Sequence, residues 1–204
     1  MSGSLAPGLL VAAPSLKCPF FHHTVVLLVH HDEEGSFGFV VNKAADVSFD
    51  AIVHELQLET GPGKDAGGEH AAGATEPEPA REPPLILYGG PVKPETGWIL
   101  FDPRGIDPMA QSLDVAAEVS VTASLGMLQE LAVGRGPARR VMLLGYSGWS
   151  PGQLDAELQQ GSWIPVDVSS ELVFEAPIEA RWRLALEALG IDPGRIVDGF
   201  IASA

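Results

Sequence analysis

The sequence of 204 residues is poor in cysteine, in positive charge and in long apolar runs. The single cysteine, Cys18, cannot form an internal disulfide, which fits a reducing compartment and predicts a cytoplasmic protein. Only 12 Lys and Arg stand against 27 Asp and Glu, so the net charge is −15 and the surface repels phosphate backbones and anionic membranes. Apolar runs such as Val25 to Val29 are far shorter than the ~20 residues that span a bilayer, and no Lys or Arg precedes the first apolar stretch. We therefore expect no direct nucleic-acid binding, no membrane span and no secretion signal.

The chain does contain 46% apolar residues, which is enough for the core of one domain of ordinary size. Residues 60–84 interrupt the pattern, because they hold five Gly and five Pro and almost no large apolar side chain. Such a composition is typical of a flexible surface insertion. We predict a single domain over residues 1–204, with this insertion inside it.

Short apolar segments rich in β-branched residues alternate with helical patterns. They predict a single compact α+β domain with a mixed β-sheet or partly closed barrel and about four flanking helices. Several strands are apolar on both faces, as in a sheet covered by helices, and residues 32–36 predict a hairpin connection. The predicted strands are residues 9–12, 24–31, 37–42, 85–88, 98–101, 115–121 and 141–146. The predicted helices begin at Ser48, Thr122, Ser150 and Pro177 and end near Leu58, Gly134, Gly161 and Gly190.

Four histidines, His22, His23, His30 and His31, lie close together in the sequence and suggest a metal site. In an extended strand, however, His22 and His30 stand about 26 Å apart at ~3.3 Å per residue, and His30 and His31 face opposite sides. No Cys pair or His-Glu-x-x-His helix completes a zinc site. We predict solvent-facing or strand-end histidines, no metal and no cofactor.

Residues 141–149 predict a strand and a turn with Ser147 at the turn, and a helix follows. The nucleophile elbow of α/β-hydrolases has the pattern Gly-x-Ser-x-Gly, whereas here Gly148 comes one position early. That triad also needs a later histidine, and none follows His70. The sequence therefore disfavours Ser147 as a nucleophile of this type.

The same turn can bind an anion, because the start of a helix presents unpaired N–H groups and partial positive charge. The other interpretation is that Ser150 caps its own helix and the aromatic residues fill core; both remain open. The Asn42-Lys43 pair ends a strand, and the Gly89-Gly90 turn permits close approach to a ligand or to another segment. The candidate ligand-binding residues are Asn42, Lys43, Gly89, Gly90, Tyr146, Ser147, Gly148, Trp149 and Gln153.

Several motifs, taken in this order, resemble the YqgE/AlgH family of bacterial proteins. The matching segments are Leu9-Leu10-Val11-Ala12, Pro19-Phe20, residues 24–30, Gly38-Phe39-Val40-Val41-Asn42-Lys43, Gly89-Gly90-Pro91-Val92, Gly97-Trp98-Ile99-Leu100, residues 144–149 with Pro151-Gly152-Gln153-Leu154, Arg181-Trp182 and Leu189-Gly190-Ile191. The similarity spans nearly the whole chain outside residues 60–84. Three positions differ from the family pattern: Ala44 replaces a usual Pro, Asp102 a usual His and Ser147 a common Ala.

The resemblance implies little about activity, because most members are uncharacterised and the namesake is described as a regulator, often labelled transcriptional. We expect a cytoplasmic, non-enzymatic regulatory protein that binds a small anionic ligand or a protein partner. The alternative is a hydrolase or transferase that uses a cleft around Tyr146 to Gln153. A direct transcription factor is disfavoured, because the net charge is −15 and no basic helix is present.

Overall fold

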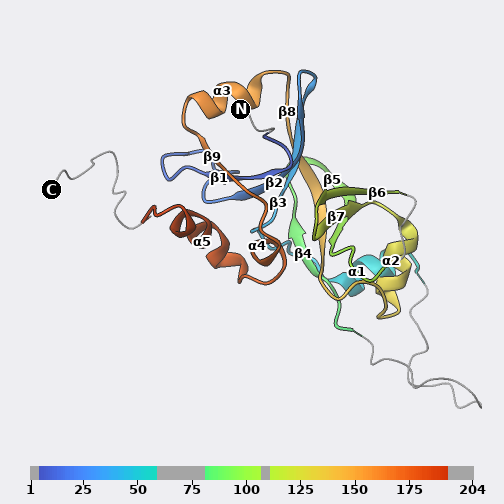
Figure 1. Cartoon of the computed structure of the whole chain (residues 1–204). Helices are drawn as coiled ribbons and strands as arrows, with labels where there is room; N and C mark the ends of the chain where they lie inside the picture. The colour runs from blue at the N-terminus through green and yellow to red at the C-terminus, as the bar shows by residue number, and fades with distance from the viewer. Residues whose placement is uncertain (1–4, 59–80, 107–110, 193–204) are drawn as a thin grey trace, which may run out of the picture.

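A nine-stranded sheet, curled into a half-barrel, is the scaffold of the computed structural model, in which residues 5–58, 81–106 and 111–192 are described (Figure 1). The strand order is β6-β7-β5-β8-β3-β2-β1-β9, and β4 lies beside β8. Neighbouring strands run antiparallel except β4 and β8, which are parallel. The strands are β1 (Gly8–Ala12), β2 (Val25–Asp32), β3 (Gly35–Val40), β4 (Leu85–Tyr88), β5 (Val92–Phe101), β6 (Ser112–Ala116), β7 (Val119–Thr122), β8 (Arg140–Trp149) and β9 (Trp163–Val166).

The long strand β8 joins the two halves of the sheet, because it pairs with three other strands. Its first half lies between β5 and the parallel β4, whereas Ser147 to Trp149 pair with β3. Strands β4 and β3 therefore follow one another along the same edge of β8. They meet where the Val40 N–H donates to the Gly89 carbonyl at 2.8 Å.

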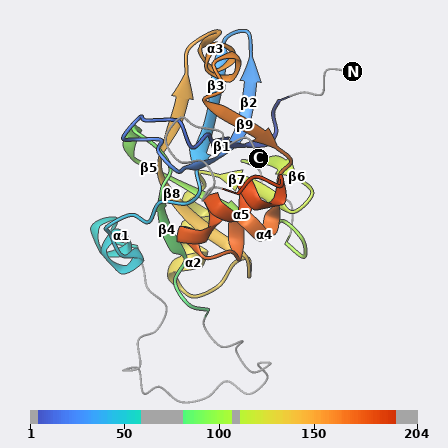
Figure 2. The same cartoon turned by 90° about the vertical axis from the view of Figure 1, so that its left-hand side faces the viewer.

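Five α-helices and one 3-10 turn cover the two faces of the sheet within the described residues (Figure 2). The side chains of a strand alternate between faces, so Leu9 and Val11 join one apolar cluster while Leu10 joins another. The first cluster packs under α4 and α5; on the other face, α3 covers one cluster, and α1 and α2 cover a third. The helices are α1 (Phe49–Glu55), α2 (Leu125–Ala132), α3 (Gln153–Gln159), α4 (Ser170–Phe174), η1 (Ile178–Ala180) and α5 (Arg181–Ala188).

The α+β fold and the partly closed sheet predicted from the sequence are confirmed, and so is the hairpin that joins β2 to β3. The Ser48 cap is also confirmed, because its hydroxyl accepts from the Ala51 N–H at 3.2 Å. Residues 60–80 of the predicted insertion lie outside the described residues. No helix in the part of the chain that the structure describes is long and apolar enough to cross a membrane.

Several details of the predicted elements are wrong, among them the turn at Ser147, which is instead part of strand β8 and pairs with β3. Residues 115–121 are not one strand but parts of a hairpin, β6 and β7. The short elements β9 and α4 were not predicted, because they have too few residues to show a period. The second helix is capped at Ser124, because Thr122 still pairs with β5 and β6 and its hydroxyl accepts from the Ser124 N–H. The third helix is capped at Gly152 rather than at Ser150, because a turn first brings the Gln153 N–H to the Ser150 carbonyl.

Candidate functional site

Gly89, Gly90 and Gly145 let three backbone segments meet where β3 follows β4 along β8. The Gly89 N–H donates to the Leu144 carbonyl at 2.8 Å. A Cβ atom on Gly90 would lie 2.3 Å from the Tyr146 carbonyl oxygen, and one on Gly145 would lie 2.5 Å from the Gly90 carbonyl oxygen. Both residues also have positive φ, 152° and 68°. The segment that the Gly89-Gly90 turn approaches is therefore β8.

Ser147 is a buried link between β8 and the end of β4. Its side chain is fully enclosed, and its hydroxyl donates to the Gly89 carbonyl at 3.2 Å. The neighbouring Tyr146 ring lies edge-on to Phe37, with 6.3 Å between ring centroids, whereas Gly148 is exposed. In this geometry the Ser147 hydroxyl makes a structural hydrogen bond and does not face a cleft.

The Asn42-Lys43 pair ties the loop of residues 18–23 to the end of β3. The Asn42 side chain accepts from the Val25 N–H and donates to the His23 carbonyl, both at 2.8 Å. The Lys43 ammonium donates to the Phe20 carbonyl and lies 5.6 Å from the centroid of the Phe20 ring. Burial lowers the pKa of Lys43 below its ordinary value.

Two phenylalanines of that loop connect the candidate residues to one another. Phe20 packs against Tyr88 with 5.5 Å between ring centroids, and Phe21 stacks on Trp149 at 6.1 Å. Lys43 and Trp149 thus belong to one neighbourhood that the loop's own aromatic rings fill. Ligand binding by the nine residues named from the sequence stays a prediction.

Glu157 organises the remaining candidate residues, and the sequence analysis missed it. One carboxylate oxygen accepts from the indole N–H groups of Trp149 at 3.0 Å and Trp163 at 2.7 Å. The other oxygen accepts from the Gln153 amide at 2.9 Å. The Gln153 side-chain carbonyl in turn accepts from the Ser150 N–H at 3.0 Å. No sequence spacing marks Glu157, because its partners come from β8 and β9.

The histidines lie in two separate groups. The ring of His23 stacks between His22 and Trp182, at 3.7 and 3.8 Å between centroids. His30 is exposed and pairs with the aspartate two residues further on, whereas His31 bonds to the Ser36 hydroxyl. Among the described residues, no three His, Cys, Asp or Glu side chains are grouped so that they could hold a metal ion.

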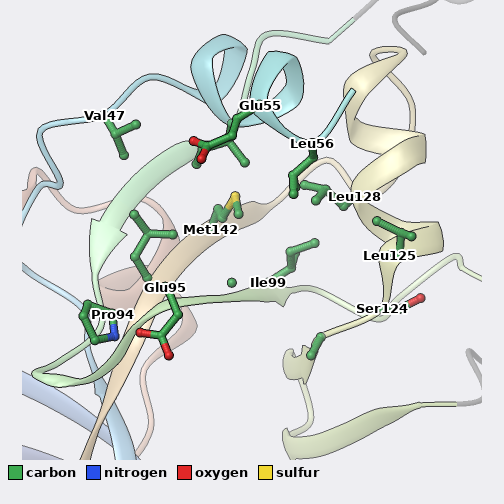
Figure 3. A pocket seen from close by; sticks show the side chains of 14 residues that line it. Val47, Glu55, Leu56, Pro94, Glu95, Ile99, Ser124, Leu125, Leu128 and Met142 are labelled. Atoms are coloured by element: carbon green, nitrogen blue, oxygen red, sulfur yellow. The ribbon is translucent and has the colours of Figure 1, made fainter. Parts of the chain in front are cut away.

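An open apolar groove of about 550 Å³ lies between α1 and α2, on the sheet face formed by β5 and β8 (Figure 3). Ile99 and Met142 line it from the sheet. Leu56, the residue after α1, and Leu125, the first residue of α2, also line it, and their exposed fractions are 50% and 57%. Its fourteen lining residues are Val47, Ile52, Glu55, Leu56, Pro94, Glu95, Gly97, Ile99, Ala123, Ser124, Leu125, Leu128, Met142 and Leu144. Leucines this exposed, gathered around one hollow, mark an interaction surface more than scattered apolar residues do.

An irregularity in β5 shapes one wall of the groove. Val92 pairs with Tyr146 and Gly97 with Leu144, so residues 93–96 all stand opposite Gly145. The Thr96 hydroxyl closes this bulge by donating to the Lys93 carbonyl at 2.8 Å, and the bulge places Pro94 and Glu95 on the rim. Gly145 makes the bulge possible, because a Cβ there would lie 3.1 Å from the Pro94 Cα.

Gly97 keeps the floor of the groove open. A Cβ atom built on it would meet only the terminal methyl of Met142, at 3.0 Å. The two charged residues of the lining are Glu55 from α1 and Glu95 from the bulge, and both are exposed. The groove therefore combines an apolar floor with an acidic rim. No pattern in the sequence marks the groove, because its lining comes from α1, α2 and the two strands β5 and β8.

A network of charged side chains lies at the end of β5, away from the bulge. The buried carboxylate of Asp102 accepts from the guanidinium groups of Arg104 and Arg139, which also pair with Glu118. The hydrogen bond from Arg104 is the main cause that lowers the pKa of Asp102 to about 2. Ser170 at the start of α4 donates to Glu118. The network holds the β6–β7 turn and α4 against β5.

Fold and groove together define a class: an α+β protein built on a half-barrel sheet, with an apolar, acidic-rimmed groove between two helices. The AlgH-like family model matches residues 9–194, and the chain belongs to this family. A UPF0301 protein of Anaeromyxobacter sp. (strain K) is 39% identical over 98% of this chain and 96% of its own length. One of Stenotrophomonas maltophilia is 36% identical over 96% and 94%.

Two solved structures have the same fold. The solution structure of the AlgH protein from Pseudomonas aeruginosa has a TM-score of 0.69 and 28% identity, and each chain is covered completely. A crystal structure of a Corynebacterium diphtheriae protein has a TM-score of 0.65 at 21% identity, with 92% and 89% coverage, and supports the fold alone.

Proposed function

We propose that this chain is a non-enzymatic regulatory protein that binds an apolar segment of a partner protein in the groove between α1 and α2. The observation that carries the proposal is the pair of half-exposed leucines, Leu56 and Leu125, on either side of a hollow whose floor is also apolar. A folded chain gains nothing by leaving such side chains in water. Covering them stabilises a complex by about 25 cal/mol per Å² of apolar surface removed from water.

A protein segment fits the groove better than a small molecule does. Sites for small ligands enclose most of the ligand surface, whereas here the two leucines of the rim stay half in solvent. The charged rim residues, Glu55 and Glu95, disfavour phosphates and nucleic acids, in keeping with the net charge of −15.

The alternative, an enzyme acting around Tyr146 to Gln153, has less support. The serine there is enclosed and donates to a backbone carbonyl, and the Gln153 amide is held by Glu157. A nucleophile needs a base within hydrogen-bond reach and a path for the substrate. The small anionic ligand expected at Lys43 would have to compete with the Phe20 carbonyl for the ammonium.

A neutral fluorescent probe tests the groove directly. N-phenyl-1-naphthylamine carries no charge, so the acidic rim does not repel it, and its emission rises in an apolar site. We expect saturable binding to the whole chain that is lost in the double variant Leu56→Ser, Leu125→Ser. The matched control is Leu113→Ser, Leu189→Ser, which removes leucines exposed by 50% and 42% outside the groove.

Because all four leucines are exposed, the melting temperatures of both variants are expected to stay near that of the wild type. Equal loss of emission in both variants would refute the proposal.

A further inference from the structure

We infer that the occupant of this groove is an amphipathic helix with a positively charged edge. The inference rests on the proposed function and adds to it the conformation and the charge of the partner segment. Two independent features support it. The backbone groups at the centre of the groove floor are already hydrogen-bonded within the sheet, and the charges on the rim are negative.

At Ile99 and Met142, the centre of the groove floor offers no free backbone edge to a guest. Ile99 of β5 pairs with Thr122 on one side and with Met142 on the other, and Met142 of β8 also pairs with Ile86 of β4. An extended peptide binds a sheet by adding to a free edge, and at Ile99 and Met142 both edges of the strand are already paired. A segment that lies on this floor must therefore satisfy its own N–H and C=O groups, as a helix does.

The apolar lining suits one face of such a helix. Ile52 comes from α1 and Leu56 directly follows that helix, whereas Leu125 and Leu128 come from α2 (Figure 3). The floor lies between these two groups. Side chains spaced at i, i+3, i+4 and i+7 form an apolar stripe on a helix, and a hollow bounded by two helices is where such a stripe docks.

The rim selects the charge of the flanking residues. Glu55 and Glu95 stand on the α1 side and the β5 side of the groove, and within the lining they are the charged residues. Lys or Arg beside the apolar stripe would pair with them, whereas an acidic helix would place like charges together. The net charge of −15 adds long-range attraction for a basic segment.

The test uses defined peptides and the whole chain. The probe is a fluorescein-labelled 14-residue peptide of Leu and Lys with leucines at i, i+3, i+4 and i+7; a Leu/Glu peptide of the same pattern and a Leu/Lys peptide of scrambled order are the comparisons. We expect fluorescence anisotropy to show binding of the patterned Leu/Lys peptide, at least tenfold weaker binding of both others, and weaker binding at high salt.

Charge variants locate the interaction. The double variant Glu55→Gln, Glu95→Gln is expected to bind the patterned Leu/Lys peptide about three- to tenfold more weakly, because two exposed ion pairs are lost. The matched control, Glu33→Gln with Glu34→Gln, changes the net charge equally at the β2–β3 turn, which lies at the top of Figure 1, away from α1 and α2. This control is expected to change the affinity less than twofold.

The outcomes separate the two levels of the argument. Equal binding of the Leu/Lys and Leu/Glu peptides, lost in Leu56→Ser with Leu125→Ser, would overturn the basic partner and leave the groove as a binding site. If the scrambled peptide binds equally well, the inference that the partner is helical is wrong. If the control charge variant weakens binding equally, the charge effect comes from the net charge and not from the rim of the groove. Absence of both peptide and neutral-probe binding would overturn the proposed function itself.

Discussion

Replacing Gly145 by Ala tests whether the close approach of three segments builds the wall of the groove. Two costs add at this position. The residue has φ of +68°, where an L residue loses about 1–2 kcal/mol relative to glycine. The new Cβ atom would also lie 2.5 Å from the Gly90 carbonyl oxygen and 2.9 Å from that of Val92, so the backbone itself must move, at a further cost of about 1–3 kcal/mol.

The sum, about 2–5 kcal/mol, corresponds to a fall in melting temperature of about 4–20 °C for a chain of this size. Differential scanning calorimetry measures it. Gly161→Ala is the matched control, because Gly161 has φ of +72° and nothing within 4 Å of a built Cβ. That variant carries the conformational cost alone, about 1–2 kcal/mol, and is expected to melt about 2–8 °C lower than the wild type.

Gly97→Ala supplies the opposite expectation on the neighbouring strand. Its Cβ would touch only the flexible end of Met142, and Ala in a strand restricts the unfolded chain more than Gly does, so stability stays the same or rises by about 0.5 kcal/mol. The added methyl nevertheless enters the groove, so we expect weaker binding of N-phenyl-1-naphthylamine. If Gly145→Ala melts no lower than Gly161→Ala, the reasoning about backbone crowding is wrong.

Three further predictions concern polar groups. Glu157→Ala leaves the buried indole N–H groups of Trp149 and Trp163 without their acceptor. We expect the free energy of unfolding to fall by about 2–4 kcal/mol and the tryptophan emission to change. An unchanged free energy of unfolding would contradict this prediction. The folded pKa of Asp102 is lowered to about 2, so its contribution, on the order of 1–2 kcal/mol, is complete above about pH 4 and lost as the pH falls toward 2. The difference in melting temperature between wild type and Asp102→Asn therefore shrinks over that interval, and a constant difference would refute the assignment. Lys43→Met removes the ammonium from the Phe20 carbonyl and lowers stability by about 1 kcal/mol in chemical denaturation; if sugar phosphates raise the melting temperature of the wild type and of this variant equally, Lys43 is no anion site.

The sequence predicted the elements whose signals are local. Runs of β-branched residues gave the positions of most strands, because side-chain alternation and burial act within a few residues. Ser48 was recognisable as a cap because its partner, the Ala51 N–H, is three residues away. The Gly89-Gly90 turn was recognised as a place of close approach, whereas its partner segment and the role of Gly145 were not.

Elements without a local signal were missed. Strand β9 pairs with β1 across more than 150 residues, and its four residues carry no detectable period. The chain also continues as a strand through Thr122, because two neighbouring strands bond to it there, and this tertiary pairing overrides the preference of threonine for a cap.

The sequence by itself determined the class of the fold, the acidic surface and the residues at which backbones crowd together. Only the tertiary structure decided what those residues do, because Lys43 meets Phe20, Ser147 meets Gly89 and Glu157 meets two indoles through contacts between distant segments. The groove, too, is decided only by the tertiary structure. Its walls come from α1, α2 and the β5 bulge, and a hollow between three elements exists only once the sheet has fixed their distances.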